Sequence, residues 1–385
     1  MKPQPHSLFP RTALSALCAL ALGSSVALAS PGVDDETIRL GMVNVQTGPA
    51  SALGQGMLQG SSAVFNAVNA SGGVNGRQIE LLVGDDGYEP DLAIEETLIM
   101  IEDEDVFSLY GYVGTPTSNA VLPIVKELEV PLVGLFTGAG SLRSPVTEQV
   151  FNVRGSYNDE ADAMVDHFVN NGAEKVSVFY QNDGFGKAVL SGATKALKKR
   201  GMSVHNTGTF ERNTMAVKTG LADILRDPPD AIVMVGTYAP IAEFIKQARA
   251  VGLDAMMSTV SFIGTKNLIE AAGPAGNGVI ITQVVPNPDG NDIPVVEECR
   301  RLIQKDSGES LNYINLEGCL SAKVMVEALE RAGDSPTRDS LIAGLEGASS
   351  LDLGGLSLSY SSDNHQGMNV IYKTAIQDGK AVPIE

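Results

Sequence analysis

The sequence predicts an α/β protein made of two doubly wound lobes, each built on a parallel sheet. From residue 38 onward, short apolar strands alternate with longer amphipathic segments, and this order is typical of a parallel sheet with helices on both faces. The alternation starts again near residue 155, and no low-complexity linker separates the two runs. We therefore expect two lobes joined by ordered crossings around a cleft, rather than tethered independent domains.

The first run of alternating segments predicts the first lobe. Its strands are expected at 38–45, 78–84, 107–113 and 131–136, and its helices at about 53–70, 90–104 and 117–128. Leu53, Met57 and Val64 fall on one face of the first helix, as a period of about 3.6 residues requires. Pro90 suits the first turn of the second helix, where no N–H is needed for the helical hydrogen bonds.

The second run repeats the pattern and then changes. Strands are expected at 175–181, 203–210, 231–237, 255–260 and 279–285, and helices at about 159–171, 186–200, 217–226, 240–251 and 263–272. After Pro286, helices at about 294–306, 313–332 and 336–346 follow without strands between them, and strand-like pieces come last at 353–360 and 368–376. We assign residues 31–154 plus 286–364 to the N-terminal lobe and residues 155–285 plus 365–385 to the C-terminal lobe.

Residues 1–29 have the order of a cleaved secretory signal peptide. Lys2 and Arg11 precede an apolar run at 13–22, and a small-x-small cleavage site follows at 27–29. A membrane anchor is the weaker alternative, because a span needs roughly 20 strongly apolar residues. Lipid attachment at Cys18 is also disfavoured, because the preceding residue is a leucine. We therefore expect export to the periplasm.

Charge and cysteine content restrict the partners and the covalent chemistry. The chain carries 27 basic and 46 acidic residues, for a formal net charge of −19, which repels phosphate backbones and argues against a nucleic-acid partner. Beyond the signal peptide only Cys299 and Cys319 remain. A disulfide and two buried thiols are equally good readings, because the sequence does not show whether the geometry permits a bridge.

Catalytic and metal-binding patterns are missing from the sequence. A Gly-x-Gly run at 54–60 lacks the tight strand–turn–helix context of a dinucleotide site. No Gly-x-Ser-x-Gly turn occurs, and the histidines at 167, 205 and 365 are isolated, without the paired spacing of metal ligands. We expect no enzymatic activity, no cofactor and no metal.

Loops rich in Gly, Ser and Thr follow several predicted strands, at 114–119, 137–143 and 156–160. Ligands of open parallel sheets bind at the carboxyl ends of strands, where helix N-termini point. Glycine N–H groups and hydroxyls suit a carboxylate that is held by neutral dipoles. Ordinary turns have the same composition, so both interpretations stand.

The sequence resembles the branched-chain amino acid-binding family, the type I periplasmic binding proteins of ABC transporters. The resemblance covers essentially all of the chain after the signal peptide, and its strongest segments are LGMVNVQTGP (40–49), SGGVNG (71–76), GDDGYEPD (84–91), YQNDGFGK (180–187) and EFIKQARAVG (243–252). It implies a periplasmic receptor with three crossings between the lobes, no enzyme activity and no cofactor. We expect a monomer that carries a small-molecule ligand to ABC transporter permease subunits; a ligand-sensing receptor on the same fold is the alternative.

The resemblance also implies binding residues. Gly114, Thr115 and Thr117 match one loop that grips a carboxylate, and Ala139, Gly140 and Ser141 match a second. The resemblance places side chains that cover or line the ligand, or that help to hold an amine, at Leu53, Tyr157, Asp159, Phe185 and Tyr238.

One position departs from the family pattern. Leucine-binding relatives have a glutamate for the ligand's ammonium where this chain has Ser261, and residues 258–262 contain no acid. An unpaired buried ammonium is costly. An α-amino acid therefore requires Asp159 or Glu160 as a substitute; a small carboxylate without an amine, with an aromatic body as one option, is the alternative.

Overall fold

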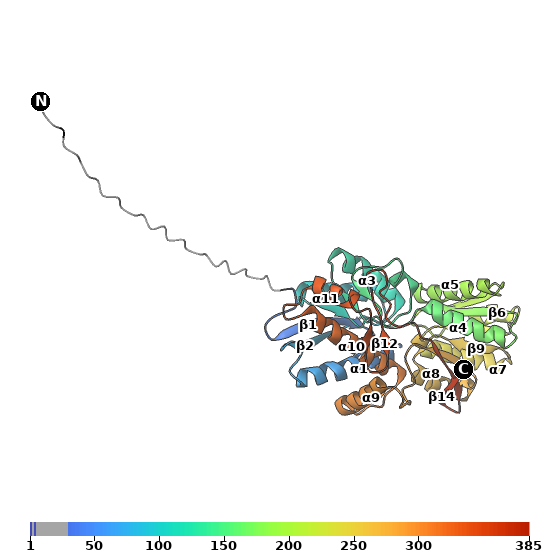
Figure 1. Ribbon diagram of the computed structural model, residues 1–385. Coiled ribbons are helices and arrows are strands. Elements are labelled where there is room, and N and C mark those ends of the chain that lie inside the picture. The colour runs from blue at the N-terminus through green and yellow to red at the C-terminus, as the bar shows by residue number, and fades with distance from the viewer. Residues whose placement is uncertain (2–3, 5–29, 385) are drawn as a thin grey trace.

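A computed structural model describes Met1, Gln4 and residues 30–384 (Figure 1). Apart from Met1 and Gln4, the predicted signal peptide lies outside the described residues. Figure 1 shows two α/β bodies side by side, and one of them combines the first third of the described chain with the helices of residues 294–346. Among the described residues, no helix combines the length and apolar character that a membrane crossing requires.

The first body is built on a five-stranded parallel sheet of order β2-β1-β3-β4-β5. Its strands are β1 (Thr37–Asn44), β2 (Gln78–Asp85), β3 (Ser108–Tyr110), β4 (Leu132–Val133) and β5 (Val150–Phe151). Its helices are α1 (Ser51–Ala70), α2 (Pro90–Leu98), α3 (Thr115–Glu127), α9 (Pro294–Ser307), α10 (Tyr313–Ala332) and α11 (Arg338–Glu346). Leu40 and Met42 of β1 are fully buried, as expected for a strand that helices cover on both faces.

Helices α1 and α10 pack closely because glycines lie at their contact. A Cβ on Gly60 would lie 2.0 Å from the Asn315 carbonyl oxygen, and one on Gly318 would lie 2.4 Å from the Met57 carbonyl oxygen. The two backbones could not approach this closely with larger residues. The late helix α10 is thereby fixed to the first helix of the chain.

The second body has a seven-stranded sheet of order β14-β13-β10-β9-β8-β6-β7. Its strands are β6 (Val176–Gln181), β7 (Thr207–Phe210), β8 (Ala231–Val235), β9 (Met256–Thr259), β10 (Ile280–Gln283), β13 (Tyr372–Gln377) and β14 (Lys380–Ile384). Its helices are α4 (Tyr157–Asn170), α5 (Gly184–Lys199), α6 (Lys218–Leu225), α7 (Tyr238–Ala250) and α8 (Thr265–Ala272). Strand β13 runs antiparallel to both of its neighbours, β10 and β14.

Several predicted segments differ from the observed ones. The strands expected at 107–113 and 131–136 are regular only over 108–110 and 132–133, because Gly111 and Gly134 turn the chain with φ of 66° and 73°. The helix expected to reach residue 104 ends at Leu98 and continues as a π-turn, Ile99–Asp103. The piece expected at 353–360 is part of a small hairpin, β11 (Leu351–Asp352) and β12 (Ser357–Leu358). The edge strand β14 was not anticipated.

The chain passes between the two bodies at three places: between β5 and α4, between β10 and α9, and between β12 and β13. Arg143 joins the first crossing to the third, since its Nε donates to Gln366 Oε1 at 2.8 Å and its Nη2 donates to the Arg154 carbonyl oxygen at 3.1 Å. The predicted two-lobed α/β class is confirmed. The residue limits that we assigned to the lobes remain our proposal.

Cys299 of α9 and Cys319 of α10 form a disulfide, with their Cα atoms 6.0 Å apart. Both residues are fully buried. Of the two readings left open by the sequence, the structure therefore has the bridge. It links two helices that are both packed against α1.

Removing this bridge should lower the free energy of unfolding by about 3 kcal/mol, because the cross-link restricts the unfolded chain over 20 residues. The comparison is urea unfolding of the wild type and of the Cys299→Ser, Cys319→Ser double variant. Thiol titration of the denatured, unreduced protein without its signal peptide should find no free thiol. Two free thiols in that titration would contradict the bridge.

Candidate functional site

The carboxyl ends of the two sheets face each other across a cleft. In the first sheet, the chain leaves β1 toward β2 and returns on the other side at β3; in the second, β6 is followed by β7 on one side and β8 on the other. Such switch points open a crevice for ligands. The starts of α3 and α5 meet there, with the Thr115 methyl carbon 3.8 Å from the Cβ position of Gly184.

Hydrogen-bond donors of the first body gather at one wall of the cleft. The Thr115 and Thr137 hydroxyl oxygens lie 2.7 Å apart, and the Ala139 N–H donates to Thr137 Oγ1 at 3.3 Å. Helix α3 begins after Gly114 without a side-chain cap, so the N–H groups of Thr115 and Thr117, at the positive end of the helix dipole, have no side-chain acceptor in the described part of the chain. This wall is suited to an anion.

Two neighbouring hydroxyls on α3 differ in what they offer a ligand. Thr117 donates to the Val113 carbonyl oxygen at 2.6 Å, so its hydroxyl is left only as an acceptor. Ser118 is also fully buried, and its Oγ makes no hydrogen bond within the described chain. Ser118 was not among the predicted site residues.

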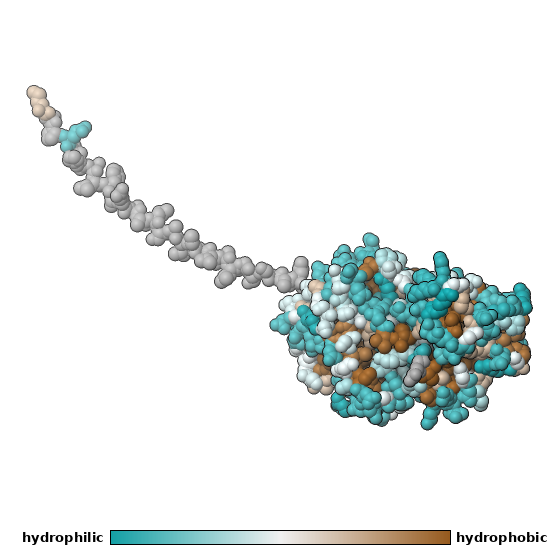
Figure 2. Space-filling model, turned by 45° about the vertical axis from the view of Figure 1, so that its right-hand side comes forward, coloured by the Kyte–Doolittle hydropathy of each residue, from teal (hydrophilic) through white to brown (hydrophobic). Residues whose placement is uncertain are grey.

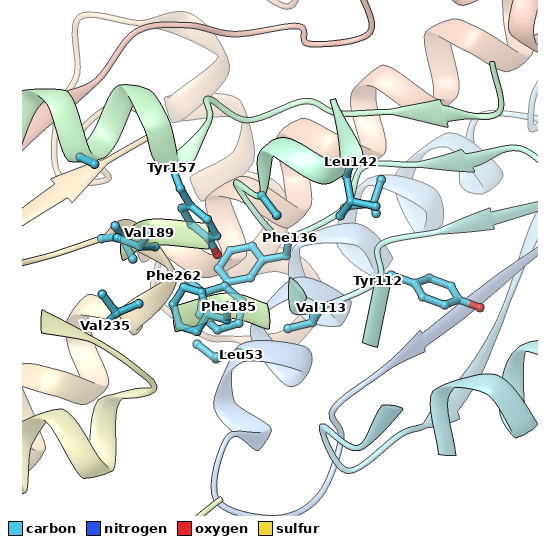
Figure 3. Packing of buried hydrophobic residues seen from close by; sticks show 14 of the residues in the cluster. Leu53, Tyr112, Val113, Phe136, Leu142, Tyr157, Phe185, Val189, Val235 and Phe262 are labelled. Carbon is cyan, nitrogen blue, oxygen red and sulfur yellow. The ribbon is translucent and has the colours of Figure 1, made fainter. Parts of the chain in front are cut away.

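An aromatic cluster fills the middle of the cleft (Figure 3). The Phe262 ring lies 5.3 Å from the Phe136 ring and 4.7 Å from the Phe185 ring, and Phe185 lies 5.3 Å from Tyr157. Leu53 lies beneath these rings, and all five side chains are buried. Of these rings, Phe136 belongs to the first body and the other three to the second, so the contact between Phe262 and Phe136 joins the two bodies.

Tyr88 is a cleft residue that sequence reasoning missed. It is fully buried in the loop after β2, with φ of 64°, which is uncommon outside glycine. A Cβ on Gly114 would lie 2.3 Å from the Tyr88 ring. The lack of a side chain at Gly114 therefore makes room for the ring. Its hydroxyl lies near Gln181 but makes no hydrogen bond of ordinary geometry among the described residues, and burial raises its pKa. The sequence could have indicated Tyr88, because it lies in the segment 84–91, which is among those that resemble the family most strongly.

Arg154 lies behind the aromatic cluster, at the first crossing. It is fully buried, with its Cζ 4.9 Å from the centre of the Phe136 ring and 5.8 Å from that of Tyr157. Its Nη2 donates to Glu160 Oε1 at 3.2 Å and to Ser261 Oγ. Its Nη1 lies 3.3 Å from Glu317 Oε1. The sequence could have indicated Arg154 as a site residue, because it is a lone arginine at the end of an otherwise apolar strand.

Glu160 has no acceptor position left for a ligand. Its Oε1 accepts from Arg154 and from Ser261 Oγ at 3.0 Å, and its Oε2 accepts from the Ser261 N–H at 2.7 Å and from Thr282 Oγ1 at 2.6 Å. Asp159 is engaged in a capping box, where its Oδ2 accepts from Ser156 Oγ at 2.6 Å. Ser261 therefore belongs to the same network as Glu160.

The remaining predicted residues lie at the rim. Ser141 is exposed and donates to Asn119 Oδ1, and Gly140 is partly exposed. With Asp159 they line an open groove of about 770 Å³. Tyr238 is half-buried at the start of α7, and its hydroxyl interacts with Ser51 and the Ala52 backbone of the opposite body.

A second contact between the bodies closes the other side of the cleft. Arg212 Nη2 lies 2.6 Å from Glu89 Oε2, and Asn213 Nδ2 donates to Glu89 Oε1 at 2.7 Å. Both pairs join the loop after β7 to the loop after β2. They hold the bodies together without contributing to the aromatic centre.

The profile of one protein family, described as periplasmic binding protein, matches residues 37–381. The chain belongs to this family. Its members are solute-binding proteins and not enzymes, and this periplasmic binding protein has the type I fold of its structural neighbours. Within the described residues, no group of three His, Cys, Asp or Glu side chains could hold a metal ion.

Known relatives cover nearly the whole chain. A crystal structure of a possible leucine/isoleucine/valine-binding protein from Rhodopirellula baltica is 33% identical, with a TM-score of 0.87, over 93% of this chain and 98% of that one. A substrate-binding periplasmic protein from Ralstonia solanacearum is 28% identical, with a TM-score of 0.84, over 90% and 100%. The Leu/Ile/Val-binding protein homolog 3 of Brucella melitensis is 22% identical over 97% of this chain and 100% of the relative.

Proposed function

We propose that this protein is the substrate-binding subunit of an ABC importer and captures a small carboxylate that has no amine and has an apolar, preferably aromatic, body. The observation that carries the proposal is the saturation of Glu160, whose two oxygens already accept four hydrogen bonds. A ligand ammonium in the middle of the cleft would therefore find no open acceptor on Glu160, and burying it unpaired is costly.

The donors at the cleft wall favour a carboxylate. Thr115, Thr137 and the start of α3 present hydroxyl and N–H groups. Behind this wall, Arg143 donates to the carbonyl oxygens of Thr137 and Ala139, at 3.0 Å each. Its positive charge therefore lies directly behind the loop that would hold the acid group.

The body of the ligand would be held by the rings of Tyr88, Phe136, Tyr157, Phe185 and Phe262. Rings from both bodies meet in this cluster, so a flat apolar ligand would be enclosed when the lobes close. Closure would then depend on the ligand, and a transporter could distinguish loaded from empty protein. The signal peptide pattern supports a periplasmic location for this receptor, and ABC transporter permease subunits would be its partners.

A branched-chain amino acid is the second candidate, and the names of the Rhodopirellula and Brucella relatives favour it. The two candidates differ in the ammonium group and in the preferred side chain. Matched pairs of compounds that differ only in the ammonium group therefore discriminate between them.

Calorimetric titration with phenylpropanoate and isocaproate should give tighter binding than titration with phenylalanine and leucine, which are their amine-bearing counterparts. We expect a preference of at least about tenfold, since an unpaired buried charge costs more than about 1.4 kcal/mol. Equal or tighter binding of the amino acids would reject the amine-free class.

Tyr88→Phe tests the position of the site. Loss of a hydroxyl that contacts the ligand should weaken phenylpropanoate binding by about tenfold. Tyr112→Phe is the matched control, because the Tyr112 hydroxyl bonds Thr97 at 2.8 Å and points away from the cluster (Figure 3). The control should leave the affinity unchanged; equal effects of the two variants would remove Tyr88 from the site.

A further inference from the structure

A charged cluster is buried at the base of the cleft, where the two bodies join. It consists of Arg154 on the first crossing, Glu160 on α4 and Glu317 on α10, with exposed fractions of 0%, 0% and 3%. The guanidinium lies between the carboxylates, 3.2 Å from Glu160 Oε1 and 3.3 Å from Glu317 Oε1. The cluster thus links a helix of each body through a single arginine.

The two carboxylates are not equivalent. Glu160 accepts four hydrogen bonds, whereas among the described residues Glu317 is held only by its ion pair with Arg154. Burial raises the pKa of Glu317 to about 7. Glu317 can therefore gain a proton near neutral pH.

Few other charges face Glu317. Arg143 approaches from behind the loop 137–139. Helix α1, which packs on α10, contains no Asp, Glu, Lys or Arg. The charges around Glu317 are therefore two arginines and Glu160, and with Glu317 ionised they sum to zero.

A carboxylate in the cleft would lie close to this cluster. Arg154 contacts the Phe136 ring, and Thr137, the next residue, belongs to the donor wall. An added negative charge within about 10 Å, in surroundings of low dielectric constant, shifts the pKa of a carboxyl upward by about one unit. Protonation of Glu317 would return the buried charge to zero.

We infer, on the basis of the proposed function, that this cluster compensates the charge of the ligand: an anion is captured together with one proton from solvent, which binds to the Glu317 carboxylate. Arg154 positions that carboxylate through their ion pair. Glu317 is the group that compensates the charge of the ligand.

The test is calorimetric titration of the whole protein with phenylpropanoate, isocaproate and benzoate, from about pH 6 to about pH 8. The wild-type affinity should fall about five- to tenfold over this range, because fewer molecules carry the proton that binding requires. The observed heat should differ between phosphate and Tris buffers, because the buffer supplies the proton.

Glu317→Gln has the shape of the protonated acid, so its affinity should not depend on pH in this range and should exceed the wild-type affinity at about pH 8 by at least about fivefold. Glu330→Gln is the matched control, since Glu330 is exposed on the same helix, and it should keep the wild-type pH dependence. Burial also raises the pKa of Asp86 to about 7, and the Glu317 variant separates the two acids.

Each result decides the inference. The inference would be overturned by a wild-type affinity that is independent of pH, or by a pH dependence that persists in Glu317→Gln. If the carboxylates still bind in that case, the proposed function stands. Binding of phenylalanine or leucine without binding of any carboxylate would overturn both. The buffer comparison needs only wild-type protein, so the inference can be rejected even if the variant does not fold.

Discussion

Replacing Glu160 with alanine should lower the free energy of unfolding by about 3–5 kcal/mol, because it leaves Arg154 buried without its best partner. It also removes the acceptor for the Ser261 N–H and for Thr282 Oγ1, and unsatisfied buried donors are costly. The measurement is urea unfolding monitored by circular dichroism.

Asp162→Ala is the control for this prediction. Asp162 lies on the same helix and pairs with Arg200 at 2.8 Å, but its side chain is 38% exposed. A pair of this kind contributes about 0–1 kcal/mol. If the two variants were equally stable, the buried cluster would not hold the bodies together as we describe.

Replacing Phe262 with alanine should weaken phenylpropanoate binding by about 10- to 100-fold. The free energy of unfolding should fall by less than the free energy of binding does. Phe262 follows β9 of the second sheet, but it packs against Phe136 and Tyr88 of the first body. Its burial therefore depends on closure of the cleft, and burying a side chain of this size contributes about 1.5–3 kcal/mol. Calorimetry gives the affinity, and small-angle scattering of the ligand-free protein should show a more open shape.

Phe179→Leu serves as the contrasting variant. Phe179 stacks on Phe244 at 3.9 Å, inside the second body. Its replacement should reduce stability by about 1 kcal/mol and leave the affinity unchanged. An affinity loss in Phe179→Leu as large as that in Phe262→Ala would show that general destabilisation, rather than closure, controls binding.

The surface is consistent with ligand contacts concentrated at the cleft. Figure 2 shows polar side chains over most of the visible face, with apolar residues in scattered patches. Only seven large hydrophobic residues, Met1 among them, are exposed in the described part of the chain. The aromatic rings are instead gathered inside, between the two bodies.

The sequence alone was sufficient to predict the fold class, and it also led to the proposed location of the site. Strand and helix periods are local, so the alternation that restarts near residue 155 can be read without any long-range contact. The same holds for the loops at 114–119 and 137–143, which follow strands and so lie at the carboxyl edge of a sheet. The lack of an acid at 258–262 was also visible, and it directed attention to Asp159 and Glu160.

Only the tertiary structure decided how the polar groups are paired. Glu160 and Ser261 are separated by 101 residues, and no local pattern indicates that one accepts from the other. The same limit applies to the Arg154–Glu317 ion pair, the Cys299–Cys319 bridge and the burial of Tyr88 against Gly114. Periodicity determines which face of an element is buried, whereas the partner of a buried charge depends on which distant elements the fold brings together.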